Sequence, residues 1–386
     1  YCVTMSSKGL RLLGFAMKNI KTLPKEGDMI EEDLTFIGIM GIIDPPRVEV
    51  KHAINTCHEA GIRVIMITGD HKLTAKAIAK DLGIYKNGDL VVDGEELSKM
   101  SDLKLRNTIK NISVFARVTP QDKLRIVNAL KKNKEIVAMT GDGVNDAPAL
   151  KKADIGVAMG ITGTDVAKDA AAMILLDDNF TTIEVAVKEG RRVYRNIQKV
   201  IQYLLAGNIA EVLTIFVSML FNLPSPLLAV HILFINLVTD TLPSLALGID
   251  PASPNVMKHK PVKEGSLFER GLVFRIGFYG VFLAIITLVA YFIGQDDSYN
   301  VGMTMAFTVL CLSQIFHSLN QSSSITSLFS KDYPRNKMLF LSMVGSIFFL
   351  MIVLFITPIR EFFSLSVLSG NEWLIVILLS LSPILI

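Results

Sequence analysis

Cysteine is scarce in this chain, and the net charge is small. The three cysteines, in a chain of 386 residues, are Cys2, Cys57 and Cys311. Because they are scattered, they predict neither a disulfide framework nor a cysteine-based metal site. The formal net charge is +3, and only 19% of the residues are charged. A balance this close to neutral disfavours a nucleic-acid partner.

Apolar residues are abundant, at 51% of the chain, but they are unevenly distributed. The part before about residue 199 has the composition of an ordinary soluble protein, and long apolar runs follow it. The sequence therefore predicts a soluble part and a membrane part, within a length that allows two or three domains. The chain begins with Tyr1 and stops within the apolar run SPILI, so we expect it to be the C-terminal part of a longer polypeptide.

In the soluble part, short apolar runs alternate with helical patterns, which predicts a parallel β-sheet flanked by helices. Strands are expected at residues 34–43, 62–67, 112–116, 136–139, 155–158 and 172–176, the first of them buried because of its β-branched residues. Helices are expected at residues 48–60, 72–82, 120–130 and 147–152. Residues 87–97 are expected to form only a turn and a short excursion.

The stretch TGDGVNDAPAL, residues 140–150, combines a strand end, a tight polar turn and a helix start. Gly141 and Gly143 allow the backbone to approach a ligand closely. Asp142 and Asp146 place two carboxylates in one turn, which suits Mg²⁺. A merely polar loop is the alternative, but two carboxylates and an amide at this spacing favour the metal site.

Two further groups suit a phosphate. Thr68, Gly69 and Asp70 place a hydroxyl, a glycine and a helix start at the end of a strand, which can cradle a phosphate. Lys123 lies in the first turn of the helix expected at residues 120–130, where its ammonium group can neutralise phosphoryl charge.

The membrane part begins with a helical pattern over residues 179–221, polar in its first half and long enough to span a bilayer in its second. Further spans are expected at residues 227–249, 272–293, 301–318, 338–357 and 373–386, which makes six. Two loops between spans are basic, which places them with the soluble part on the cytosolic side. Their basic residues are Lys258, Lys260, Lys263, Arg270, Lys331, Arg335 and Lys337.

Two acidic residues interrupt the apolar spans. Glu211 is the sole charged residue within residues 200–221, and Asp240 is the sole one within residues 227–249. A carboxylate at mid-span is costly unless it faces a polar interior. Asn208 is expected to share a helical face with Glu211, and Asn236 and Thr239 to lie with Asp240. These oxygen-bearing groups suit a hard cation such as Ca²⁺, although amides and hydroxyls also serve as polar contacts between helices.

Five segments together resemble one family, the P-type cation-transporting ATPases. They are DPPR at 44–47, MITGD at 66–70, FARVTPQDK at 115–123, TGDGVNDAP at 140–148 and TGTDVAKDAA at 162–171. The resemblance covers essentially the whole chain. It implies an α/β haloacid-dehalogenase-like phosphorylation domain followed by an all-α six-helix transmembrane domain. The expected boundaries are a nucleotide-binding remnant and linker at 1–33, the phosphorylation domain at 34–180 and the membrane domain at 181–386.

The resemblance also implies a role for individual residues. Asp142 would hold Mg²⁺, Thr68 and Lys123 would stabilise phosphoryl charge, and Asn145 and Asp146 would support them. The residues assigned to ATP binding are Arg11, Thr68, Gly69, Asp70, Arg117, Lys123 and Asn145. Arg11 is otherwise an ordinary surface arginine. Asp44 and Arg47 are expected to form an ion pair at a hinge.

The segments NIAE at 208–211 and NLVTD at 236–240 resemble the sarcoplasmic-reticulum-type Ca²⁺ pumps in particular. Asn208, Glu211, Asn236, Thr239, Asp240 and Gln314 are the ion ligands that this resemblance implies. Gln314 stands where those pumps carry a glutamate, so this site has one negative charge less. That difference weakens the expectation of a second bound ion.

The expected function is ATP-driven export of Ca²⁺ from the cytosol through a phosphoenzyme cycle. The alternatives are a pump for Mn²⁺ or Na⁺, or a membrane-anchored phosphatase or scaffold with the same fold. The family's phosphorylated aspartate lies in an Asp-Lys-Thr-Gly-Thr motif, which does not occur here. We therefore expect this chain alone not to hydrolyse ATP. Its expected partners are the lipid bilayer of the plasma membrane, ATP, Mg²⁺, Ca²⁺ and the N-terminal part of the same polypeptide.

Overall fold

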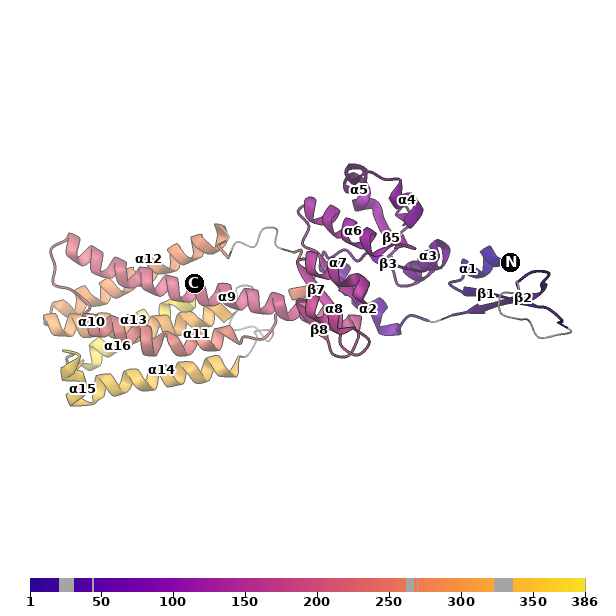
Figure 1. Cartoon of the computed structure of the whole chain (residues 1–386). Helices are drawn as coiled ribbons and strands as arrows, with labels where there is room; N and C mark the ends of the chain where they lie inside the picture. Colours follow the sequence, from indigo (N-terminus) through magenta and orange to yellow (C-terminus); the bar gives the residue numbers. More distant parts are fainter. Residues whose placement is uncertain (21–30, 44, 262–266, 269, 323–335, 386) are drawn as a thin grey trace. The chain divides into compact units, whose positions relative to one another are not determined.

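The computed structural model describes the whole chain except residues 21–30, 44, 262–266, 269, 323–335 and 386 (Figure 1). The expected ion pair of Asp44 and the basic loop residues Lys263, Lys331 and Arg335 therefore lie outside the described residues. The chain divides into two compact units. The first comprises Tyr1–Val187 and Met257–Pro261, and the second comprises Lys188–Val256 and Val262–Ile386.

The first unit opens with a short helix, α1 (Cys2–Ser6), and two antiparallel strands, β1 (Arg11–Met17) and β2 (Thr35–Ile42). The prediction of a buried strand at residues 34–43 is wrong. Most of β2 is exposed, including Phe36 at 66% and Met40 at 57%. The physical reason is that β2 pairs with the equally apolar β1 in a separate two-stranded sheet instead of joining a parallel sheet flanked by helices.

A three-stranded parallel sheet follows, in the order β3 (Met66–Thr68), β5 (Ile112–Ala116), β4 (Leu90–Asp93). Its central strand β5 is completely buried. The prediction for residues 87–97 missed β4 and the following helix α4 (Gly94–Ser98). The apolar run of β4 is too short to show a period, and it becomes a strand because β5 offers it a pairing edge.

A second parallel sheet has the order β6 (Ala138–Gly141), β7 (Ile155–Met159), β8 (Met173–Leu175). The strands of the single expected sheet are therefore divided among three sheets, with β2 in the two-stranded one. Strands β3 and β6 each lie at an edge among the described strands. Helix α6 (Pro120–Lys132) connects their cores, because Ile126 packs in the core of the first sheet and Val127 in that of the second.

The other helices of this unit agree with the expected ranges to within two residues. They are α2 (Val48–Glu59), α3 (Lys72–Asp81) and α7 (Ala147–Lys152). Gly83 follows α3 with a φ of +79°, as expected of a residue that ends a helix. Besides α1 and α4, the helices that the sequence did not predict are α5 (Asp102–Thr108) and α8 (Asp165–Ala170), with short 3₁₀ turns at Ile109–Asn111 and Val144–Asp146.

The division between the units falls within α9 (Phe180–Leu220), a continuous helix of 41 residues. The prediction of one long helix over residues 179–221 is confirmed. The second unit continues with α10 (Ala229–Phe234), a π-helical turn (Ile235–Thr239), α11 (Thr241–Gly248) and a 3₁₀ turn at Val256–Lys258 that belongs mostly to the first unit. It ends with α12 (Arg270–Gln295), α13 (Tyr299–Ser322), α14 (Lys337–Phe355), α15 (Thr357–Phe362), α16 (Gly370–Leu381) and a 3₁₀ turn at Ser382–Leu385.

Among the described residues, five helices are long and apolar enough to cross a membrane. They are Phe180–Leu220, Ala229–Gly248, Gly271–Gln295, Tyr299–Ser322 and Lys337–Phe355. Gly370–Leu385 is a shorter apolar helix, so the sixth span stays a prediction. Helix α13 is buried along almost its whole length and packs against α11, α12, α14 and α16, which makes it the central helix of this unit (Figure 1).

Candidate functional site

The turn after β6 is organised around one buried carboxylate. Asp146 is only 4% exposed, and its Oδ2 accepts hydrogen bonds of 3.3 Å from the backbone N–H groups of Asp142 and Gly143. Its Oδ1 lies 2.5 Å from Lys123 Nζ. Asp146 therefore fixes the shape of the turn and the position of the lysine. The carboxylate of Asp142 is left exposed and forms no ion pair with any described residue, so a hard cation such as Mg²⁺ fits it.

Lys123 is placed by the way its helix begins. Thr119 caps α6 by accepting a hydrogen bond from the Asp122 N–H, and Asp122 in turn accepts one from the Thr119 N–H. Pro120 occupies the first helical position, where its missing N–H costs nothing. These local features set Lys123 in the first turn, where the partial positive charge of the helix end adds to its own.

Thr68 ends the edge strand β3. Its hydroxyl donates to Asp70 Oδ2 at 2.9 Å and accepts from the Asp70 N–H at 3.1 Å. Gly69 is exposed, and apart from its two chain neighbours no described residue has an atom within 4 Å of the point where a Cβ would be. The backbone here is therefore accessible to a phosphate. Ligands of parallel sheets bind at the carboxyl ends of the strands, where both Thr68 and Asp142 lie.

Of the other predicted residues of this unit, Arg11 and Arg117 lie on other elements, and Asn145 lies in the turn itself. Arg11 begins β1 in the separate two-stranded sheet, and its side chain is exposed. Arg117 follows β5 with a φ of +48°, and its carbonyl oxygen would lie 2.3 Å from a Cβ on Gly94. Asn145 is exposed within the 3₁₀ turn Val144–Asp146. The structure thus brings Lys123, Asp142 and Asp146 together, whereas Thr68 and Asp70 form a separate hydrogen-bonded pair.

Asp178 is a residue that the sequence reading missed. Its carboxylate accepts hydrogen bonds of 2.7–3.0 Å from the N–H groups of Gly160, Ile161 and Thr162, and one of 2.8 Å from the Thr162 hydroxyl. These bonds, that from Ile161 first, lower the pKa of Asp178 to about 2. The same loop reaches the site, because the Thr164 N–H donates to the Asp142 carbonyl at 2.8 Å. The sequence feature that could have identified Asp178 is the pair of consecutive aspartates, Asp177 and Asp178, after the last strand.

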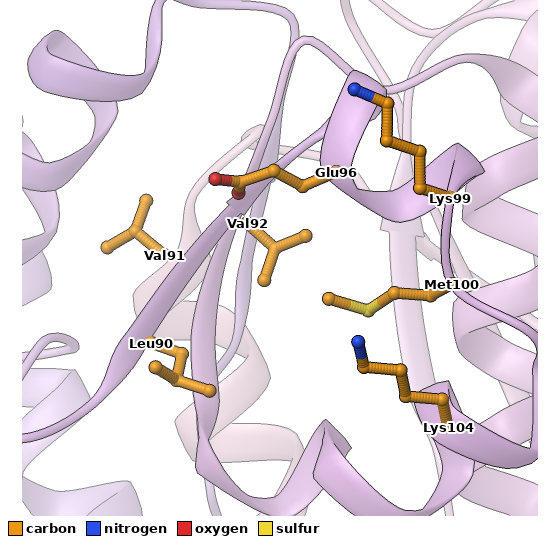
Figure 2. A pocket seen from close by; sticks show the side chains of 7 residues that line it. All are labelled: Leu90, Val91, Val92, Glu96, Lys99, Met100 and Lys104. Carbon is orange, nitrogen blue, oxygen red and sulfur yellow. The ribbon is translucent and has the colours of Figure 1, made fainter.

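A hollow of about 400 Å³ in this unit lies elsewhere. Leu90, Val91 and Val92 of β4 line one side, and Met100 and Lys104 face them, with Glu96 and Lys99 at the rim (Figure 2). None of the predicted site residues lines it. The chemistry of the site therefore belongs to the turn after β6 and not to this hollow.

In the second unit, two buried carboxylates lie on neighbouring helical segments. Glu211 of α9 is 4% exposed and accepts a hydrogen bond of 3.2 Å from Asn236 Nδ2. Asp240 is 1% exposed and accepts one of 3.2 Å from the Tyr203 hydroxyl. Asp240 directly follows the π-helical turn, and such turns frequently occur at functional sites.

Gln314 lies beside these carboxylates on the central helix α13. A Cβ on Gly207 would lie 2.6 Å from Gln314 Nε2 and 3.4 Å from Asp240 Oδ2, so both side chains converge on this glycine. Both amide atoms of Gln314 and Asp240 Oδ2 are buried without a hydrogen-bond partner among the described residues. Buried polar atoms are nearly always paired, and oxygens left unpaired at one place suit a cation.

The remaining two predicted ligands are placed differently. Asn208 lies three residues before Glu211 in α9, but its side chain is exposed. Thr239 is buried, and its hydroxyl donates to the Ile235 carbonyl at 2.9 Å within its own helix. The described residues therefore assemble Glu211, Asn236, Asp240 and Gln314, with Asn208 and Thr239 at the margin.

Comparison with known proteins gives matches over both units. Residues 224–386 match the family described as cation transporting ATPase, C-terminus. Residues 8–154 and 123–186 match two families that are both described as haloacid dehalogenase-like hydrolase.

Individual relatives cover almost the whole chain. Calcium-transporting ATPase 1 of Bacillus cereus is 46% identical over 99% of this chain and 45% of its own length. Calcium-transporting ATPase of Bacillus subtilis is 45% identical over 98% of this chain and 43% of its own length. Calcium-transporting ATPase 3, endoplasmic reticulum-type, of Arabidopsis thaliana is 39% identical over 98% of this chain and 41% of its own length. The chain thus spans less than half the length of these relatives.

Proposed function

Since this chain is related over nearly its whole length to cation-transporting ATPases, we propose that it is the C-terminal part of an ATP-driven Ca²⁺ pump. The observation that carries the proposal is the convergence of Glu211, Asp240 and Gln314 between apolar helices. A soluble phosphatase has no use for carboxylates at that place. A pump also needs a site for phosphoryl transfer, and the Lys123–Asp146 pair beside the exposed Asp142 is the candidate for it.

In the proposed organisation, residues 1–33 are a remnant of the nucleotide-binding domain and the linker after it. Residues 34–180 form the phosphorylation domain, and residues 181–386 form the membrane domain with six spans, the last being the short helix Gly370–Leu385. The phosphorylated aspartate would come from the preceding part of the polypeptide. The edge strands β3 and β6 support this proposal, because a strand paired with them would end beside Thr68 and Asp142.

At the phosphorylation site, the residues of this chain bind and orient. Lys123 holds a positive charge where the phosphoryl group would pass, and Asp146 keeps the ammonium group in place. Thr68 would turn its hydroxyl from Asp70 to donate to a phosphoryl oxygen, and the Gly69 backbone leaves room for that oxygen. Asp142 would hold Mg²⁺, which when bound neutralises phosphate charge. Arg11, Asp70, Arg117 and Asn145 are assigned to the nucleotide side of the same site.

At the ion site, Glu211 and Asp240 supply two negative charges, and Asn236 and Gln314 supply amide oxygens. This donor set favours Ca²⁺, which takes six to eight oxygen ligands. Asn208 and Thr239 would join it on rotation of their side chains. Because Gln314 is neutral, one ion per cycle is the stoichiometry that we propose.

We place the soluble unit in the cytosol and the helices in the plasma membrane. In the sequence, Lys258 and Lys260 lie between the second and third expected spans and Lys337 lies at the start of α14, and the positive-inside rule assigns such basic connections to the cytosol.

The test is formation of a phosphoenzyme from labelled ATP by the gene product that contains this chain, at graded Ca²⁺ concentrations. Labelling should depend on micromolar Ca²⁺. Glu211→Gln and Asp240→Asn should each weaken the apparent Ca²⁺ affinity at least about tenfold, since each removes a ligand charge. If labelling depends on another cation instead of Ca²⁺, the proposed transported ion is wrong but the proposed phosphoenzyme mechanism stands. Labelling that forms with no cation at all would overturn the pump.

Matched controls use the same chemistry at exposed sites. Glu361→Gln and Asp297→Asn remove a carboxylate from exposed positions in α15 and in the turn after α12. These two variants should retain the Ca²⁺ response of the unaltered protein.

Gly207→Ala offers a milder test of the ion site. The added methyl group meets Gln314 Nε2 at 2.6 Å, so the amide has to move away from Asp240. We expect the apparent Ca²⁺ affinity to fall about fivefold, which corresponds to about 1 kcal/mol. Gly277→Ala in α12 is the control, because its added Cβ meets no described atom within 4 Å beyond its chain neighbours and the nearby backbone of its own helix. Equal Ca²⁺ affinities of Gly207→Ala and Gly277→Ala would show that Gln314 is not a ligand of the ion site.

A further inference from the structure

A third buried carboxylate of the second unit lies just beyond α11. Asp250 is fully buried, at 0% exposure. Lys199 Nζ lies 2.5 Å from its Oδ2. The Ser322 hydroxyl donates to both of its oxygens, at 3.0 and 3.2 Å, and Asn336 Nδ2 donates to Oδ1 at 2.7 Å. We call these four side chains the Asp250 clasp.

Backbone groups complete the clasp. Lys199 Nζ also donates to the Ser322 carbonyl at 2.7 Å. Asn336 Nδ2 also donates to the Ala246 carbonyl at 2.9 Å, and its Oδ1 caps α14. Asn196, one turn before Lys199, donates to the Asp250 carbonyl at 2.8 Å. A buried charge with this many partners defines the relative position of the elements that supply them.

Those elements are the ones that carry the ion site. Lys199 precedes Glu211 by twelve residues in α9, Asp250 follows Asp240 by ten, and Ser322 follows Gln314 by eight in α13. At 1.5 Å per helical residue, Lys199 lies roughly 18 Å from Glu211 along α9, and Ser322 lies roughly 12 Å from Gln314 along α13. One carboxylate therefore ties together, at one end, the three segments whose spacing sets the distances between Glu211, Asp240 and Gln314.

The clasp is not itself an ion site, because the ammonium group of Lys199 already neutralises its single carboxylate. Nor is stability a sufficient reason for it, since a buried ion pair is often no more stabilising than apolar residues of similar size. The best-attested use of such a pair is to fix one register among several.

We propose that Lys199 and Asp250 are positioning residues for cation binding, which hold α9, α11 and α13 at the spacing that the ion site requires. The proposal rests on the proposed ion-pump function. It assigns to the pair an effect on ion affinity without any contact with the ion.

The test uses the gene product that contains this chain and measures equilibrium binding of labelled Ca²⁺ and ATP-driven phosphorylation. Lys199→Gln and Asp250→Asn should each raise the Ca²⁺ concentration for half-saturation about tenfold. The first leaves the fully buried Asp250 carboxylate without its ion partner, and the second leaves the half-buried Lys199 ammonium group without its anion. The maximal amounts of bound Ca²⁺ and of phosphoenzyme at saturating Ca²⁺ should fall less than twofold. A structural defect alone would instead lower the maximal level at unchanged affinity.

Two further variants keep the test decisive if a single variant folds poorly. The double variant Lys199→Gln with Asp250→Asn should recover most of the affinity, because no uncompensated charge remains and two amides can still pair. Ser322→Ala removes one donor without changing charge and should shift half-saturation two- to threefold. Lys337→Gln is the matched control, because Lys337 is exposed and lies beside Asn336 in the sequence. It should leave the Ca²⁺ concentration for half-saturation unchanged.

The outcomes separate the two proposals. If the three single variants Lys199→Gln, Asp250→Asn and Ser322→Ala all keep the Ca²⁺ affinity of the unaltered protein, and that protein binds Ca²⁺ normally, the positioning role is overturned and the pump proposal stands. A double variant no better than the worse single variant also overturns it, because the effect is then not that of a pair. An unaltered protein that binds no Ca²⁺ overturns both proposals together.

Discussion

Replacement of Lys123 by methionine is expected to slow phosphoenzyme formation by a factor of about 10²–10³. This is the usual loss when one group that stabilises developing charge is removed from a phosphoryl- or acyl-transfer site. The substitution also leaves the carboxylate of Asp146, which is 4% exposed, without its ammonium partner. Loss of one partner of a buried pair costs about 3 kcal/mol, so the soluble unit should unfold at a lower temperature as well.

Lys131→Met on the same helix is the matched control for Lys123→Met. Lys131 also contacts an aspartate, with its Nζ 2.8 Å from Asp154 Oδ1, but both side chains are about one-third exposed. Surface ion pairs contribute less than about 1 kcal/mol, so Lys131→Met should leave phosphorylation almost unchanged. Rapid-quench measurement of phosphoenzyme and thermal unfolding distinguish the two variants. Equal rates would show that Lys123 does not act on the phosphoryl group.

The second large effect is expected for Gly141→Ala. A Cβ on Gly141 would lie 2.5 Å from Asp146 Cβ and 2.8 Å from its Cγ, which no adjustment of a flexible side-chain end relieves. Either the turn opens or Asp146 moves away from Lys123. Overpacking of this kind costs about 1–3 kcal/mol, and the displaced lysine should lower phosphoenzyme formation at least tenfold.

Gly143→Ala makes this comparison sharp, because it adds the same methyl group two residues away. There the nearest atoms lie 3.8 Å from the added Cβ, an ordinary contact distance. We expect its effect on both unfolding temperature and phosphorylation to be small. The argument from the packing of Asp146 would be wrong if Gly143→Ala were as damaging as Gly141→Ala.

The sequence predicted those features that depend on neighbouring residues. The turn at Asp142 and the helix start that places Lys123 follow from glycine, proline and capping residues within a few positions. The long helix through residues 180–220 follows from an uninterrupted helical pattern. The two membrane carboxylates, Glu211 and Asp240, were evident because charge is rare in apolar runs.

Contacts between distant residues were beyond the reach of the sequence. Lys199 was one basic residue among several in its helix, and nothing nearby indicates that Asp250, 51 positions away, is its partner. Asp178 likewise acts on a loop that begins 18 positions earlier. The division of the expected sheet was also missed, because the pairing of a strand such as β2 depends on which partner strands are present and not on its own composition.

The two sheet edges have a consequence for the chain as a separate molecule. Strands β3 and β6 present backbone donors and acceptors that lack a strand partner within the described residues, and the hairpin of β1 and β2 adds exposed apolar side chains. Edges of this kind pair readily with any extended peptide, including another copy of the same chain. The soluble unit is therefore expected to self-associate through these edges, and a further strand of the same polypeptide paired with them would prevent that association.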